Sequence, residues 1–291
     1  MNTSSSVFET KRAESVATSV AEALAASAET ALEDEKWAQR WDAVGLCQPH
    51  DPVTGHAWSG INRYALVAGR TVIDGAAVGA WATRQDWESE GFAVAPGSQG
   101  IVVLRASSGG LEAVTVYNAC QLTEDGPADA RYGFPPELDA AGVDGLFGAA
   151  SGGAGGWEPD PQRRASQLAD LAVAQAGAML GRPASWQDPA EALACVLASQ
   201  TVVNALGFPY SPDPPSPDVV EEWSDLLRGP DGAQAAMALT EDAARLAAAV
   251  VEQIANRQLQ PEPVAAERAD AAQRVDSGQR ADSAYAHSII D

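Results

Sequence analysis

The sequence predicts an α+β fold, with a small N-terminal α+β domain that contains a β-hairpin and an α-helical C-terminal region. Two segments rich in Val, Ile and Tyr, residues 100–106 and 113–119, are joined by residues 107–111, which include a Gly-Gly pair. This arrangement predicts a hairpin. Helical periodicity precedes it, and beyond residue 162 amphipathic segments follow one another.

The first helix is predicted over residues 7–41. Apolar residues recur near the helical period and two tryptophans follow, four residues apart: Val16, Val20, Leu24, Trp37 and Trp41. Because the apolar face is thin, residues 1–30 are predicted to form an acidic helical or disordered arm. The α+β domain is then expected over residues 31–125.

Residues 48–60 are expected to form a loop, since two prolines and two glycines interrupt any period. Residues 61–69 suit a short helix. Another helix is expected from about Thr83, a suitable N-cap, to a stop at Gly91.

The second half of the chain is predicted to be a linker followed by helices. Residues 126–162 are rich in Gly, Pro and Asp, as linkers are. The helical region is expected over residues 163–260, with helices at 163–181, 188–206, 218–229 and 232–259. Residues 261–291 are polar and charged and are expected to be a disordered tail.

The composition excludes several classes of protein. A formal net charge of −22 opposes nonspecific binding to nucleic acids and to acidic membranes. The three cysteines, Cys47, Cys120 and Cys195, are far apart and form no CxxC pair, so neither a disulfide framework nor a zinc site is expected. There is no apolar segment of the ~18 residues that span a bilayer and no signal-peptide pattern, so we expect a cytoplasmic protein.

Five short blocks resemble, in order and spacing, the N-terminal domain of ArdC-type antirestriction proteins. They comprise Trp37 and Trp41; Pro49, Thr54, Gly55, Trp58, Gly60, Ile61 and Asn62; Trp81, Thr83 and Gln85; Gly97 and Gly100; and Tyr117, Asn118 and Gln121. The resemblance implies an α+β domain that binds single-stranded DNA and protects the incoming DNA of a mobile element.

Three departures from the family's pattern affect charge and spacing. The turn Ala95–Gly100 has no basic residue where the family usually has Lys or Arg, and Asp51 stands where the family tends to have Asn. Gln85 comes one residue early. Since phosphate neutralisation provides most nonspecific affinity for DNA, the changes in charge predict weaker DNA binding.

A fourth departure concerns catalysis. ArdC proteins normally continue into a metallopeptidase-like domain with His-Glu-x-x-His on a helix, but this chain has only His50, His56 and His287, none at helical spacing. The segment around Glu191, near the place of the family's third metal ligand, resembles a remnant of that domain. We therefore expect no catalytic residue, metal or cofactor, and neither peptidase nor nuclease activity.

Aromatic and basic residues of the domain are candidates for DNA contacts. Base stacking suits aromatic side chains, and phosphate contacts suit arginines. The candidates are Trp58, Trp81, Trp87 and Tyr117 for stacking, and Arg63, Arg70, Arg84 and Arg105 for phosphates. The alternatives are that the aromatics belong to the core and that the arginines are surface charges paired with acids.

Polar residues of the same blocks are candidates for reading base edges or for holding loops by hydrogen bonds. They are Asn62, Thr83, Gln85, Asn118 and Gln121. For Asn62, which follows Gly60 and Ile61, a bond from the side chain to the backbone is the favoured interpretation. The expected nucleic-acid-binding set is Trp58, Asn62, Arg63, Trp81, Arg84, Gln85, Arg105, Tyr117 and Asn118.

The sequence thus predicts a non-enzymatic, antirestriction-like protein of a phage or mobile element that binds single-stranded DNA. Its expected partners are this DNA, a host defence enzyme or virion protein, or a second copy of the chain, with no membrane. The alternative is an acidic inhibitor that mimics the charge of DNA and occupies a host nuclease.

Overall fold

The computed structural model describes residues 3–33, 49–69, 73, 79–107, 110–124, 160–182, 188–205 and 210–258. Residues Met1–Val251 form one compact unit and Glu252–Asp291 a second. Trp37, Trp41 and Arg70, nearly all of the expected linker and the expected tail lie outside the described residues.

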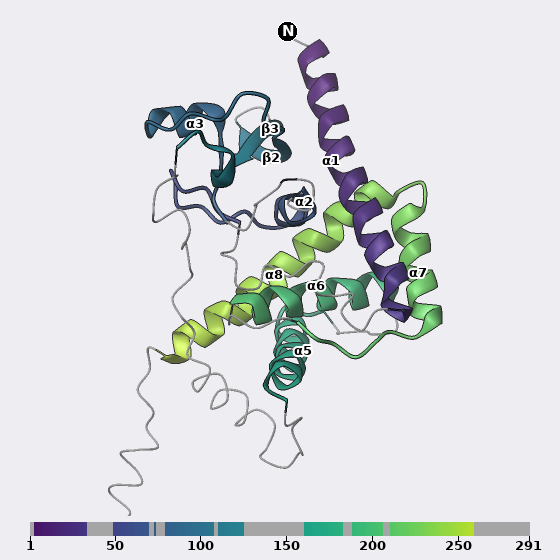
Figure 1. The fold of residues 1–291 in the computed structure, drawn as a ribbon. Helices are drawn as coiled ribbons and strands as arrows, with labels where there is room; N and C mark the ends of the chain where they lie inside the picture. The colour runs from purple at the N-terminus through teal and green to yellow at the C-terminus, as the bar shows by residue number, and fades with distance from the viewer. Residues whose placement is uncertain are drawn as a thin grey trace, which may run out of the picture. The chain divides into compact units, whose positions relative to one another are not determined.

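The elements follow the predicted order of helix, helix, hairpin and helices (Figure 1). The helices and strands of the N-terminal half are α1 (Thr3–Glu29), η1 (Thr30–Leu32), α2 (Ile61–Gly69), β1 (Trp81–Thr83), α3 (Arg84–Ser89), β2 (Ile101–Ser107), β3 (Gly110–Asn118) and η4 (Ala119–Gln121). The C-terminal helices are α5 (Pro161–Met179), α6 (Pro189–Ala205), α7 (Pro217–Arg228) and α8 (Gly232–Gln258). The predicted α+β class, hairpin and helical C-terminal region are confirmed.

The three strands form an antiparallel sheet in the order β1-β3-β2. Trp81 pairs with Asn118 and Val103 with Val114, without a bulge in either ladder. The strand β1 was not expected, because the sequence Trp-Ala-Thr leads directly into the helical pattern of α3. The side chain of Thr83 accepts a hydrogen bond from the N–H of Asp86 at 3.1 Å, which confirms the predicted N-cap.

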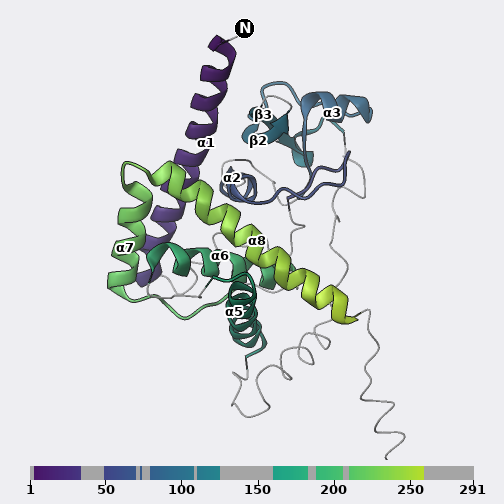
Figure 2. The same cartoon turned by 180° about the vertical axis from the view of Figure 1, so that it is seen from behind.

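Side chains alternate between the two faces of the sheet, and each face has its own core. Toward α2, Leu66 packs with Trp81, Val103 and Val116. Toward α3, Trp87 packs with a second group, Ala80, Ala82, Val94 and Ala119. Figures 1 and 2, which view the molecule from opposite sides, show β2 and β3 between α2 and α3.

The helix α1 is docked rather than free. Val16, Val20 and Leu24 are buried, and the helix contacts α2, α7, β2 and β3. At its end, Arg228 of α7 donates two hydrogen bonds of 2.8 Å to the carboxylate of Glu29. The thin apolar face is therefore sufficient to hold residues that the sequence assigned to an arm.

The helix α6 is the buried centre of the helical region, since every residue from Ala192 to Gln200 is buried. It contacts α5 and α7. Trp223 and Leu227 of α7 are also buried, as their helical spacing indicates. In the described part of the chain, no helix combines the length and apolar character that crossing a bilayer would need.

A polar pair lies within this helical core. The hydroxyl of Tyr210 donates to Oδ1 of Asp170 on α5 at 2.9 Å, and Tyr210 is 1% exposed. Burial raises the pKa of Asp170 above its ordinary value of 3.8. A raised pKa in the folded state means that ionised Asp170 destabilises the fold: its contribution to stability is full below the unfolded pKa and is lost as pH rises through the folded pKa.

We predict that Asp170→Asn gains stability relative to the unmodified protein as pH rises from about 4 to 7, because asparagine cannot ionise. Urea unfolding at both pH values measures the difference, with the exposed Asp225→Asn as a control. If the free energy of unfolding of Asp170→Asn falls relative to that of the unmodified protein as pH rises, the folded-state pKa of Asp170 is not raised.

Candidate nucleic-acid interface

Arg84, the first residue of α3, lies over the ring of Tyr117 on the central strand β3. The guanidinium of Arg84 lies 4.9 Å from the centroid of the Tyr117 ring, and its Nη1 donates to the carbonyl of Val94 at 3.3 Å. Arg84 is exposed and Tyr117 is half-buried. The outer plane of the guanidinium therefore remains available to solvent, while the inner plane is held by the ring.

Gly100 allows the ring of Tyr117 to lie where it does. A Cβ at residue 100 would come within 2.4 Å of the Thr115 side chain and 3.0 Å of a ring carbon of Tyr117. The ring is thus held between the backbone at Gly100 and the guanidinium of Arg84. The close approach explains why a glycine precedes β2.

Exposed residues of the same face continue this surface along the hairpin. Val102 lies opposite Thr115 in the register, and both point to the face that carries Tyr117. Val102 is 38% exposed, and Thr115 is also exposed. We call the surface of Arg84, Val102, Thr115 and Tyr117 the Tyr117 face. Val102 and Thr115 were missed as candidates, although strand alternation alone places them beside Tyr117.

Three of the sequence-predicted contacts instead hold the fold. Trp81 is 2% exposed and Asn118 is fully buried, so neither reaches a base without opening the core. Asn118 caps η4 by accepting from the N–H of Cys120 at 3.1 Å. Asn62 donates to the carbonyl of Leu104 at 2.6 Å and accepts from its N–H at 2.7 Å, so it covers the outer edge of β2.

Two other residues that the sequence suggested for DNA contacts, Trp87 and Gln121, hold the fold together by hydrogen bonds. Trp87 is fully buried, and its Nε1 donates to the carbonyl of Tyr117 at 3.0 Å, which fixes α3 against β3. Gln121 donates through Nε2 to the carbonyl of Gln99 at 2.8 Å. Both bonds support the segment that carries the Tyr117 face.

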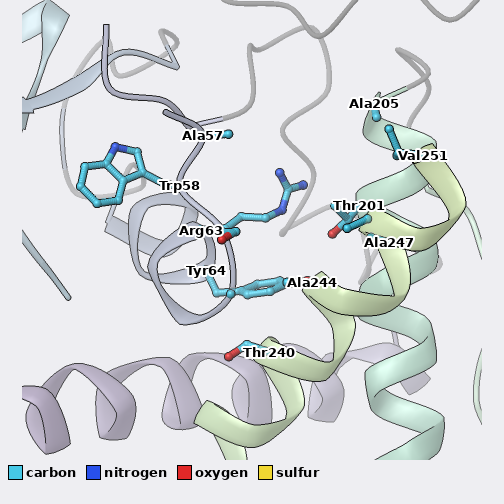
Figure 3. A pocket seen from close by; sticks show the side chains of 13 residues that line it. Ala57, Trp58, Arg63, Tyr64, Thr201, Ala205, Thr240, Ala244, Ala247 and Val251 are labelled. Atoms are coloured by element: carbon cyan, nitrogen blue, oxygen red, sulfur yellow. The ribbon is translucent and has the colours of Figure 1, made fainter. Parts of the chain in front are cut away.

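The remaining candidates are separated in space. Gln85 is exposed on α3, next to Arg84. Arg105 is exposed on the opposite face of the sheet, across from Glu112, so it does not belong to the Tyr117 face. Trp58 and Arg63 line a pocket whose other wall comes from α6 and α8 (Figure 3).

Comparison with known proteins gives the same family that the blocks resemble. The family model of the N-terminal domain of anti-restriction factor ArdC matches residues 14–127. Residues 14–127 of this chain are thus similar to the ArdC N-terminal domain. The matched range begins within α1, so it includes part of the helix that the sequence assigned to an arm.

Two crystal structures of the antirestriction ArdC protein from the R388 plasmid share the fold. The metal-free structure has a TM-score of 0.59 and 21% identity, and the Mn(II)-bound structure has a TM-score of 0.60 and 22% identity. Each match covers 82% of this chain and 98% of the ArdC chain, so the fold likeness extends into the helical region. No curated protein sequence matches this chain.

Glu191, for which the sequence resemblance suggested a metal-ligand position, is bound by an arginine. Nη2 of Arg182 lies 2.5 Å from Glu191 and 2.8 Å from Asp242 of α8. The two carboxylates raise the pKa of Arg182, and Asp242 has the larger effect. Among the described residues, no three His, Cys, Asp or Glu side chains are grouped to hold a metal ion.

The departure from ArdC at Asp51 also has a structural position. Oδ1 of Asp51 accepts from the N–H of Val53 at 2.9 Å, which closes the turn before Gly55. Asp51 therefore accepts the hydrogen bond that the amide oxygen of an asparagine could accept here, although it adds a negative charge.

We predict that Asn62→Ala lowers the free energy of unfolding by about 1–3 kcal/mol, because it leaves the N–H and carbonyl of Leu104 without their side-chain partner. Urea unfolding measures the change. Gln85→Ala, at an exposed position, is expected to stay within about 0.5 kcal/mol of the unmodified protein. Equal stability of the two variants would contradict the role given to Asn62.

Proposed function

We propose that this protein binds single-stranded DNA through the Tyr117 face and acts, without catalysis, as an antirestriction protein of a mobile element. The observation that carries the proposal is the exposed guanidinium of Arg84, held on the ring of Tyr117. A planar cation in a fixed orientation provides a surface on which an unpaired base stacks.

The rest of the Tyr117 face suits a strand without sequence preference. Val102 offers apolar contact beside the stacked pair, and the hydroxyl of Thr115 offers a hydrogen bond to sugar or phosphate. Each stacked base contributes about 1–3 kcal/mol by alanine substitution. A duplex keeps its bases paired and stacked internally, so this surface favours the single strand.

The charge of the protein limits how the strand is held. With a net charge of −22, long-range attraction to phosphates is opposed, and the turn at Ala95–Gly100 adds no cation. Few phosphates are neutralised, so the affinity is expected to change by only about −0.7 log units per log unit of salt for each phosphate contact. Affinity then depends on stacking more than on counterion release.

The non-enzymatic part of the proposal rests on the side chains of the helical region. The carboxylate of Glu191 is bound to Arg182, and the chain has no pair of histidines at helical spacing. A peptidase-like zinc site takes two such histidines and a third ligand. The two ArdC structures are of an antirestriction protein, and we extend that role to this chain.

We predict that Arg84→Ala weakens binding of a labelled ~30-nucleotide single strand about tenfold, which corresponds to about 1.4 kcal/mol. Fluorescence anisotropy at low and at ~150 mM salt measures the affinity. Arg105→Ala is the matched control, since it removes the same charge from an exposed residue on the opposite face of the sheet.

Equal losses in the two variants would indicate a general effect of charge and would contradict a stacking site at Tyr117. If the unmodified protein binds no single strand even at low salt, the proposal is wrong. The acidic inhibitor of a host nuclease would then be the function to test, by competition with duplex DNA for a basic enzyme.

A further inference from the structure

The guanidinium of Arg182 lies between two carboxylates that come from different helices. Its Nη2 donates to Oε1 of Glu191 on α6 at 2.5 Å and to Oδ2 of Asp242 on α8 at 2.8 Å. Because both oxygens accept from one nitrogen, the sum of the two distances, 5.3 Å, is the largest separation that they can have. Two ionised carboxylates this close repel each other unless a cation lies between them.

The backbone at the end of α5 places Arg182 at this point. The helix ends in a Schellman motif, in which Gly181 has φ +71°. The N–H of Arg182 donates to the carbonyl of Gly177 at 2.8 Å, and the N–H of Gly181 donates to the carbonyl of Ala178 at 3.1 Å. Arg182 is therefore fixed directly after the helix, and its side chain joins the end of α5 to α6 and α8.

The two carboxylates are also held in place by their own helices. Oδ1 of Asp188 caps α6 by accepting from the N–H of Glu191 at 3.1 Å. The second oxygen of Asp242 accepts from Nη2 of Arg245 at 2.6 Å. The side chains of Arg182, Glu191 and Asp242 are 30%, 27% and 19% exposed, and that of Arg245 is 64% exposed. Water therefore weakens the interactions of Arg182 less than those of Arg245.

A resident metal ion does not fit these residues. One of the two ArdC crystal structures is bound to Mn(II), an ion that carboxylate oxygens suit. In this chain the oxygens of Glu191 and Asp242 that face each other already accept from Arg182. Cys195, one turn after Glu191, is a poor ligand, because burial raises the pKa of its thiol to about 11 and metals bind the thiolate. The donor set therefore matches a guanidinium and not a metal ion.

We propose that Arg182 is a built-in cation that takes, between Glu191 and Asp242, the place of a divalent metal ion. A guanidinium is covalently part of the chain and cannot be removed by a chelator, whereas a bound metal ion can. The helical region is thus held together without metal, and the two carboxylates form a cation site that opens only when Arg182 is removed. This inference concerns α5, α6 and α8 and does not rest on the proposed function.

The test measures the melting temperature of the full-length protein in EDTA and in about 10 mM Mn²⁺. EDTA is expected to leave the unmodified protein within about 1 °C of its melting temperature in plain buffer. Arg182→Gln is expected to melt about 3 °C lower or more, because it leaves two carboxylates facing each other. Mn²⁺ is expected to restore at least about half of this loss, since the ion binds the folded arrangement.

Arg245→Gln is the matched control, because it removes the same charge from the other partner of Asp242 while Arg182 stays in place. It is expected to lower the melting temperature by less than about 2 °C. Mn²⁺ is expected to change its melting temperature no more than that of the unmodified protein. The control thereby corrects for general screening of an acidic surface by the ion.

The double variant Arg182→Gln/Asp242→Asn removes one of the two repelling charges. It is expected to melt above Arg182→Gln and to respond to Mn²⁺ no more than the control does. If Arg182→Gln does not fold, the double variant decides: it is expected to fold because the repulsion is relieved, and its failure to fold overturns the proposal.

Three further results would overturn the proposal. A lower melting temperature of the unmodified protein in EDTA would show that a metal ion is resident. Equal melting temperatures of Arg182→Gln and Arg245→Gln would show that the guanidinium does not join the helices. A destabilised Arg182→Gln that Mn²⁺ does not restore would show that no cation site lies between the carboxylates. None of these results depends on whether the protein binds single-stranded DNA, so the proposed function can fail separately.

Discussion

Three consecutive residues of α2 connect the sheet to the helical region. Asn62 bonds to both backbone groups of Leu104 on β2. Arg63 and Tyr64 donate instead to Asn204 and to the carbonyl of Leu197 on α6. Successive residues of a helix point about 100° apart, so three neighbours reach partners on different sides. A helix of nine residues thereby fixes the position of the sheet relative to α6.

This arrangement decides which aromatic residues are available to a ligand. Since α2 and Trp58 cover one face of the sheet, Trp81 becomes part of the core there. Tyr117, on the other face, keeps a half-exposed ring because α3 covers only the region around Trp87. The same segment, residues 57–64, forms a wall of the pocket. The hydrogen bonds from α2 side chains to β2 and α6 therefore place the Tyr117 face and the pocket on different sides of the sheet. The sequence had suggested a single binding surface.

Local patterns predicted the hairpin, α2 and the C-terminal helices because each depends on periodicity and turn residues within a short window. The strand β1 was missed because it exists through pairing with β3, in a register that joins Trp81 to Asn118, 37 residues later. The structural position of Asn62 was anticipated from its neighbours. The bond between Arg63 and Asn204, 141 residues apart, and the pocket beside it had no local signal. Long-range packing also decided the burial of Trp81 and Asn118.

In this acidic protein, the neighbours of each arginine determine whether its positive charge is neutralised or remains available to an anion. Arg182 and Arg228 are neutralised by carboxylates and serve to join helices. Arg84 is oriented by an aromatic ring and a carbonyl, which direct its charge without cancelling it. Nη2 of Arg63 donates to the amide oxygen of Asn204, which joins α2 to α6. At about 0.1 M salt an exposed charge acts only within about 10 Å, so an anion close to the protein meets the field of the nearest guanidinium more than the net charge of −22.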